Sequence, residues 1–165
     1  MALVNKVWRE SQYVPPGAEP ALTTSRDYFE NVQNVAVEQL ARTRFAYPTA
    51  EQPQLKTYTN RPEHTIGVRG PGGELLFPDI VVMDTSTTEV HLLGELETSR
   101  SLRLPDTAEK WQTFASVGLL YVYVPYGDQD FARSLVKQAR IKPAGMRAWK
   151  RNLGQNTIET VEIQI

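Results

Sequence analysis

The chain has 165 residues, a length that corresponds to one domain with a buried core. Its hydrophobic content of 41% and charged content of 22% are typical of a globular protein, and no run approaches the roughly 18 apolar residues of a membrane span. The absence of cysteine excludes disulfides, zinc–thiolate sites and thiol chemistry, and two histidines argue against a histidine-rich metal site or a Ser-His-Asp triad. Charges interrupt the first ten positions, so we expect no signal peptide and a cytoplasmic protein.

Charge is distributed unevenly along the chain. Between Thr98 and Gln155 there are ten Lys or Arg against four Asp or Glu, a net charge of +6, which leaves −7 for the rest of a chain whose total is −1. A basic half beside acidic residues suits a site that holds phosphates while carboxylates hold metal ions. Two ordinary solvated helices of mixed charge would give the same distribution.

The first part of the chain predicts an arm followed by a helix. Residues 1–24 contain four prolines or glycines without clear periodicity, which indicates an irregular N-terminal arm, and residues 25–165 are predicted to form a single domain. A capping pattern at Thr24 and apolar residues at helical spacing predict a helix over 25–43. Glu30 lies at the edge of the apolar stripe, where it is either a surface acid or an acid that faces a site on the sheet.

The middle of the chain predicts an antiparallel meander. The expected segments are a possible short strand over 55–59 and three main strands over 65–69, 74–83 and 89–97. Pro78 cannot donate a hydrogen bond to a neighbouring strand, so it predicts a bulge or a local break that would re-aim Asp79.

The last third predicts alternating helices and strands. After a polar loop over 98–105, the expected elements are a helix over 106–118 with Asp106 as N-cap, a central strand over 119–125, a helix over 128–140, and strands over 144–150 and 157–165. The helix over 106–118 is predicted to connect the third strand to a neighbouring parallel strand as a right-handed crossover.

Three acidic residues are predicted to meet on adjacent strands. Glu95 and Glu97 project from the same side of a strand because successive residues point to opposite faces. With a hairpin loop over 84–89, Asp79 lies opposite Gly94 or Glu95. Carboxylates this close raise one another's pKa, and a divalent ion such as Mg²⁺ relieves the repulsion.

The simplest metal site uses Asp79 and Glu95 as direct ligands, with the backbone carbonyl of Leu96 near enough to join them. Glu97 then holds a second ion or an attacking water. The alternative is that these side chains are solvated acids on the exposed face of an antiparallel sheet.

Pro78-Asp79 on the second strand and Glu95-Leu96-Glu97 on the third, within this order of elements, resemble the PD-(D/E)XK nuclease superfamily, most closely its restriction-endonuclease-like branch. The resemblance covers about residues 25–140. It implies an α/β fold with an αβββαβ core, a mixed sheet and helices on both faces, followed here by a C-terminal hairpin. It also implies an endonuclease that hydrolyses DNA phosphodiester bonds with Mg²⁺ or Mn²⁺ held by Asp79 and Glu95.

The chain departs from the superfamily's pattern because Glu97 stands where a lysine is usual. Glu97 acts as base or second-metal ligand, or Lys110 from the next helix supplies the missing cation, or the chain has lost cleavage and is a nucleic-acid-binding or assembly module. Arg100 and Arg103, in the loop after the acid pair, either contact phosphates or are solvated. Cutting both strands of a duplex normally requires a two-fold partner, so a homodimer is possible.

Overall fold

The computed structural model describes residues 25–165. Residues 31–165 form one compact unit, and residues 25–30, the start of the first described helix, belong to the unit Met1–Glu30. The predicted N-terminal arm, residues 1–24, lies outside the described residues. None of the helices within residues 25–165 combines the length and the apolar character needed to cross a membrane.

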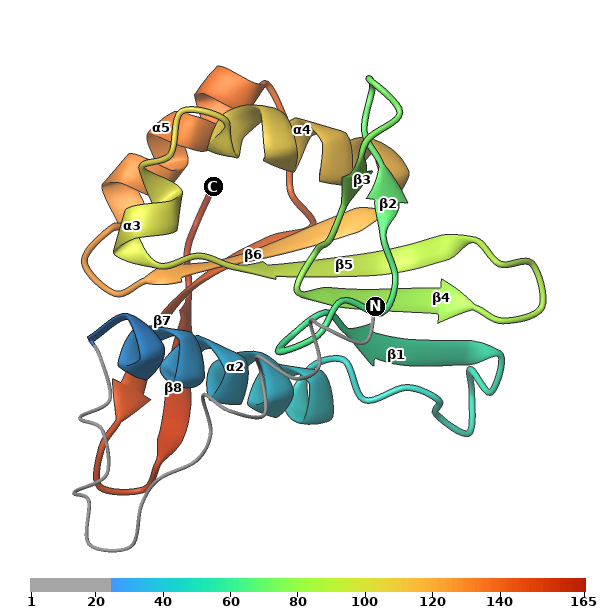
Figure 1. Ribbon diagram of the computed structural model, residues 1–165, viewed down its shortest axis with the longest axis horizontal. Coiled ribbons are helices and arrows are strands. Elements are labelled where there is room, and N and C mark those ends of the chain that lie inside the picture. The colour runs from blue at the N-terminus through green and yellow to red at the C-terminus, as the bar shows by residue number, and fades with distance from the viewer. Residues whose placement is uncertain (1–24) are drawn as a thin grey trace, which may run out of the picture. The chain divides into compact units, whose positions relative to one another are not determined.

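The described residues form four helices and eight strands, labelled in Figure 1. The helices are α2 (Ser25–Thr43), α3 (Ser99–Leu102), α4 (Thr107–Val117) and α5 (Gln129–Ala139). The strands are β1 (Leu55–Thr59), β2 (Val68–Arg69), β3 (Leu75–Leu76), β4 (Ile80–Asp84), β5 (Val90–Leu96), β6 (Leu119–Pro125), β7 (Gly145–Asn152) and β8 (Thr157–Glu162).

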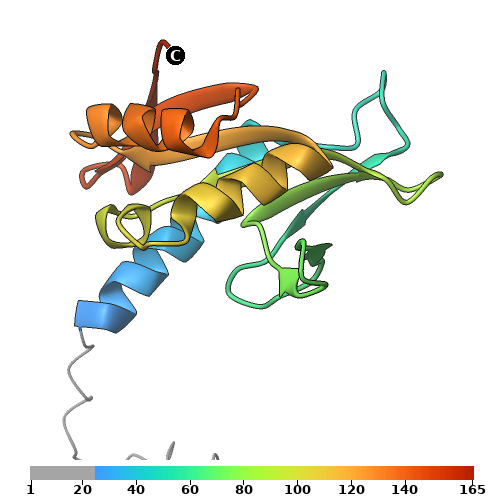
Figure 2. The ribbon, with the colours of Figure 1, turned by 90° about the horizontal axis from the view of Figure 1, so that it is seen from above.

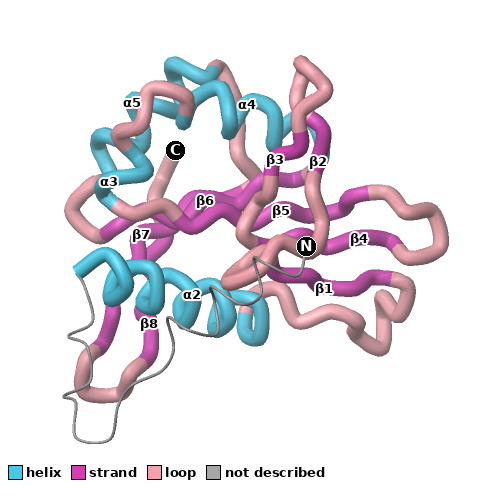
Figure 3. The backbone as a smooth tube through the Cα atoms, viewed as in Figure 1, coloured by secondary structure: helices cyan, strands magenta, loops and turns pink. Residues whose placement is uncertain are grey.

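Six of these strands form one mixed sheet in the order β1-β4-β5-β6-β7-β8, drawn in magenta in Figure 3. β5, β6 and β7 run parallel, and the other neighbouring pairs are antiparallel. The predicted parallel pairing across the helix that follows the third strand is therefore confirmed, as is the C-terminal hairpin of β7 and β8. The α/β class predicted from the sequence is also confirmed.

Apolar side chains pack on both faces of the sheet. Within residues 31–165, the buried residues of α2 pack with Leu92 of β5 on one face, whereas Leu93 packs with the buried residues of α4 and α5 on the other. Figure 2 shows α4 and α5 side by side over the sheet. Since strand residues alternate between faces, Glu95 shares the α4 face with Leu93.

The predicted meander is wrong in its first strand. The segment 65–69 contributes only β2, which pairs with β3 in a separate two-stranded sheet, and β1 instead lies beside β4. The predicted strand over 74–83 is divided, because β3 ends at Leu76 and β4 begins at Ile80. The break predicted at Pro78 is therefore confirmed, and it frees the chain before it to form the small β2–β3 hairpin.

The loop expected over 98–105 contains the short helix α3. Thr98 accepts a hydrogen bond from the backbone N–H of Ser101, and the Ser101 hydroxyl donates to Glu97 while accepting from the Thr98 N–H. Serine takes the place that glutamate or glutamine usually holds in such a cap, so the sequence pattern did not reveal it. Asp106, predicted to cap α4, makes no side-chain capping hydrogen bond.

Candidate functional site

The candidate site lies at the C-terminal end of β5, which extends past the first residue of its neighbour β4. β4 begins at Ile80, which pairs with Gly94, so the sheet offers no β4 residue beside Leu96. Two side chains take its place: the Leu96 N–H donates to Asp79 Oδ2 (2.9 Å), and the Leu96 carbonyl accepts from Gln33 Nε2 (3.0 Å). The break in the strand therefore places Asp79 against the end of β5.

The three predicted acids are all buried. Asp79, Glu95 and Glu97 are 4%, 6% and 1% exposed. The Asp79 N–H donates to Glu95 Oε2 (3.1 Å), which brings the first two together as the strand pattern predicted. The alternative interpretation, three solvated acids on an open sheet face, is wrong because all three side chains are buried. Burying carboxylates is costly unless partners compensate their charge.

Two cations of the chain provide that compensation. Lys110 Nζ on α4 lies 2.7 Å from Glu95 Oε1 and 2.8 Å from Glu97 Oε1, and Arg61 Nε lies 2.5 Å from Asp79 Oδ1. Both side chains remain partly exposed, 25% for Lys110 and 32% for Arg61. The structure thus brings Lys110 to the acids, as one of the sequence alternatives proposed.

Glu97 is held by more partners than the other two acids. Its Oε1 accepts from Trp111 Nε1 (2.8 Å) as well as from Lys110, and its Oε2 accepts from the Ser101 hydroxyl. Its backbone carbonyl accepts from Trp149 Nε1 (2.9 Å). A role for Glu97 as metal ligand or base stays a prediction, and these contacts favour a different role, that of fixing Lys110 and Trp111.

Burial dominates the electrostatics of the acids. It raises the pKa of Glu95 to about 8, helped by the negative charges of Asp79 and Glu97 and opposed by Lys110. Burial also raises the pKa of Asp79, although Arg61 opposes it. For Lys110, burial alone would lower the pKa, but Glu95 and Glu97 outweigh it and raise the pKa, so that Lys110 stays protonated at neutral pH.

The raised pKa of Glu95 predicts a pH-dependent stability. Between its ordinary value of 4.5 and about 8, the folded protein holds a proton at Glu95 that the unfolded chain has released. The free energy of unfolding should therefore fall as the pH rises through this window, and the Asp79 contribution has the same sign. Lys110 is protonated in both states throughout it. Urea unfolding at a series of pH values should show this slope in the wild type and a flatter one in Glu95→Gln; identical slopes would contradict the prediction.

The structure does not bring the other predicted residues to these acids. Arg103 donates to Asp128 Oδ1 (2.7 Å) and lies over the Phe131 ring, and Arg100 is exposed without a side-chain hydrogen bond to any residue in 25–165. Glu30 belongs to the Met1–Glu30 unit, where it accepts a hydrogen bond from Arg26 (3.0 Å).

Sequence reasoning missed the side chains that contact Asp79 and Leu96 from distant segments, Arg61 and Gln33. Neither lies in a motif: Arg61 follows β1, 18 positions before Asp79, and Gln33 reaches Leu96 from 63 positions away. The one signal the sequence offers is that Gln33 is a polar residue at helical spacing from Ala36 and Leu40, and the structure buries it.

The donor set fits a hard divalent ion. Asp79 and Glu95 supply two carboxylates that are linked through the Asp79 N–H, and Mg²⁺ typically binds one or two carboxylates while keeping waters and phosphate oxygens as its other ligands. No group of three or more acidic or histidine side chains in residues 25–165 is arranged as a metal cage. The two linked carboxylates suit a two-carboxylate site, and the role of Glu97 as a third ligand stays a prediction.

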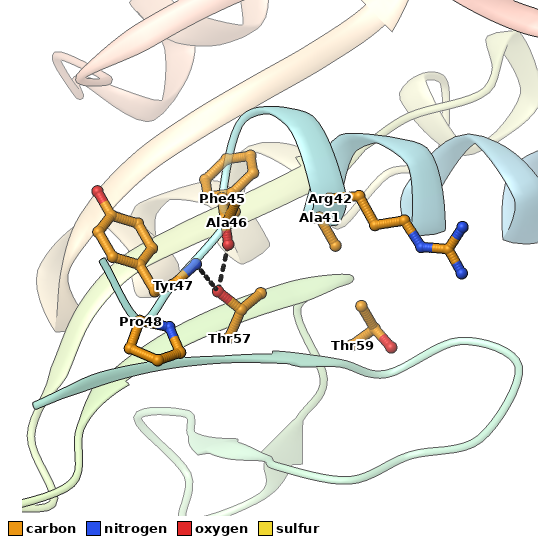
Figure 4. Close-up of a pocket in the computed structure, with 8 residues that line it drawn as sticks. All are labelled: Ala41, Arg42, Phe45, Ala46, Tyr47, Pro48, Thr57 and Thr59. Carbon is orange, nitrogen blue, oxygen red and sulfur yellow. Dashed lines mark hydrogen bonds between the residues drawn. The ribbon is translucent and has the colours of Figure 1, made fainter. Parts of the chain in front are cut away.

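A separate pocket of about 470 Å³ lies between the end of α2 and β1 (Figure 4). It is lined by Phe45, Tyr47 and neighbouring residues, with Arg42 as its one charged residue. The Thr57 hydroxyl there donates to the Phe45 carbonyl and accepts from the Tyr47 N–H (3.2 Å), so this hydroxyl is engaged by the backbone. This pocket shares no residue with the acidic site.

By its geometry, the site belongs to the class of buried carboxylate clusters balanced by a lysine and an arginine. Comparisons of the chain with protein-family models, with curated proteins and with solved structures found no match.

Proposed function

We propose that this protein is a metal-dependent nuclease of the PD-(D/E)XK superfamily that hydrolyses DNA phosphodiester bonds. One observation carries the proposal: Asp79 and Glu95 lie together at a strand break, with Lys110 Nζ 2.7 Å from Glu95. With the short elements β2, β3 and α3 left aside, the order α2, β1, β4, β5, α4, β6 supports it, because it matches the αβββαβ order that the resemblance implies.

In this proposal, Asp79 and Glu95 are the residues that hold Mg²⁺ or Mn²⁺. An ion held there would act as a Lewis acid toward the phosphate and would lower the pKa of a bound water. The Leu96 N–H fixes one oxygen of Asp79, and the Asp79 N–H fixes one oxygen of Glu95, so backbone groups orient both carboxylates. The Leu96 carbonyl oxygen already accepts a hydrogen bond from Gln33, so it can be a third metal ligand only through its second lone pair.

Lys110 supplies positive charge next to the reacting phosphate. Because its pKa is raised, it acts as a protonated lysine: it stabilises negative charge that develops on the phosphate and does not act as the base. Glu97 keeps the Lys110 ammonium in position through its 2.8 Å ion pair. The missing lysine of the superfamily's strand is thus replaced from α4.

Metal binding tests the proposal first. Calorimetric titration with Mn²⁺ is expected to give binding to the wild type and none to Asp79→Ala, because that variant loses one of two ligands. Asp84→Asn, at the other end of β4, serves as a matched control and should bind like the wild type. Plasmid nicking in Mn²⁺ then tests catalysis; nicking that survives Glu95→Ala reflects contamination and would overturn the enzyme proposal.

A second candidate is a catalytically inactive module of the same fold that binds nucleic acid or supports assembly. It is favoured by the ion pairs themselves, since Arg61 and Lys110 already compensate the acids without a metal ion. DNA binding that does not depend on Mn²⁺, together with no heat of metal binding, would select this candidate. A homodimer, which double-strand cleavage normally requires, is tested by light scattering.

A further inference from the structure

Arg61 lies on a loop that is firmly attached to the break before β4. Asn60, 3% exposed, donates through Nδ2 to the Pro78 carbonyl (2.6 Å) and the Ile66 carbonyl (2.7 Å), and its Oδ1 accepts from the backbone of Thr65 and Ile66. Its own N–H donates to the Asp79 carbonyl (2.9 Å). Every polar group of this side chain is used to hold the loop beside Asp79, so the position of Arg61 is built into the fold.

The guanidinium of Arg61 is only partly used. Its Nε donates to Asp79 Oδ1, but its two terminal amino groups have no acceptor among residues 25–165. Arg103, by comparison, uses both terminal nitrogens, on the Ser99 carbonyl and on Asp128. A partly exposed guanidinium with free N–H groups beside buried acids can bind an oxyanion, and the planar fork of arginine matches phosphate geometry.

We propose that Arg61 binds a phosphate of the DNA backbone next to the Asp79–Glu95 pair, and that Asp79 holds the guanidinium in place until a metal ion is bound. This role rests on the proposed nuclease function. Both oxygens of Asp79 already accept hydrogen bonds, one from Arg61 and one from the Leu96 N–H. A metal ion at Asp79 therefore competes with Arg61 for Oδ1, and the released guanidinium is free to bind the phosphate.

The proposal predicts that Arg61→Gln raises the affinity for metal ions and lowers the affinity for DNA. Without its competitor, Asp79 should bind Mn²⁺ several-fold more tightly, measured by calorimetry in the absence of DNA. A short DNA duplex, held with Ca²⁺ so that it is not cut, should bind about tenfold more weakly by fluorescence anisotropy. The slope of log affinity against log salt should fall by about 0.9, the value of one phosphate contact. Arg61→Lys keeps the charge and should keep the slope, while weakening affinity because the fork is lost.

Arg42→Gln is the matched control, because Arg42 also forms a 2.5 Å ion pair with a carboxylate, Glu38, but on the exposed surface of α2. It should leave the metal affinity and the salt slope unchanged. An Arg61→Gln protein with the metal affinity and salt slope of the wild type would overturn the role of Arg61 alone. A wild type that binds neither Mn²⁺ nor duplex would overturn the nuclease proposal and this role together.

Discussion

Lys110→Met is expected to lower the rate of Mn²⁺-dependent plasmid nicking by about 10²–10⁴-fold while metal binding persists. Lys110 is the one cation of the site that contacts both Glu95 and Glu97, at 2.7 Å and 2.8 Å, and it is protonated at neutral pH. Methionine keeps much of the length and volume of the side chain but removes the charge that, in the proposed function, stabilises the reacting phosphate. The measurement is the initial nicking rate, with calorimetry to establish that Mn²⁺ still binds.

Lys137→Met provides the control for this experiment, since Lys137 is an exposed lysine on α5. It should nick at the wild-type rate. A Lys110→Met protein that binds Mn²⁺ and nicks as fast as the wild type would assign the cleavage chemistry to another residue. Thermal unfolding of each variant separates a catalytic loss from a loss of folded protein.

Glu97→Leu is expected to destabilise the protein by about 3–5 kcal/mol, because it removes one partner from a buried, charged network. The substitution leaves the Trp111 N–H without its acceptor and takes away one of the two carboxylates that hold the Lys110 ammonium. It also removes the acceptor of the Ser101 hydroxyl, which belongs to the cap of α3. The free energy of unfolding from urea titration measures the effect.

The matched control is Glu109→Gln, an exposed acid on α4 beside Lys110, which should change the free energy of unfolding by no more than about 0.5 kcal/mol. Glu97→Gln should fall between the two, because its amide oxygen still accepts from Trp111 while the charge is lost. A Glu97→Leu protein as stable as Glu109→Gln would mean that the network contributes little, and Glu97 would be free to serve another purpose.

The sequence predicted the acidic residues of the site and the strand break beside them better than it predicted which strands pair. The period of two along a strand placed Glu95 and Glu97 on one side, and Pro78 marked the break that brings Asp79 to Glu95. These are local properties of the backbone. The predicted meander was wrong in its first strand: the segment 55–59, and not 65–69, pairs with β4. Short apolar segments do not specify which neighbouring strand they pair with.

The partners of the acids depend on tertiary structure. The hydrogen bond from Trp111 to Glu97 could not be predicted, since that contact requires α4 to pack at the end of β5. Arg61 and Gln33 come from segments whose local pattern says nothing of an acidic site. Long-range polar contacts of this kind follow from the packing of the whole unit and leave no periodic signal.

The attachment of Glu97 to Trp149 also bears on the order of events during protein synthesis. The cluster draws on Gln33 near the start of the unit and on the Trp149 indole, which donates to the Glu97 carbonyl (2.9 Å) from strand β7. Non-local contacts of this kind form slowly, because distant segments must first be brought together. A nascent chain therefore cannot form the complete cluster until residue 149 has left the ribosome.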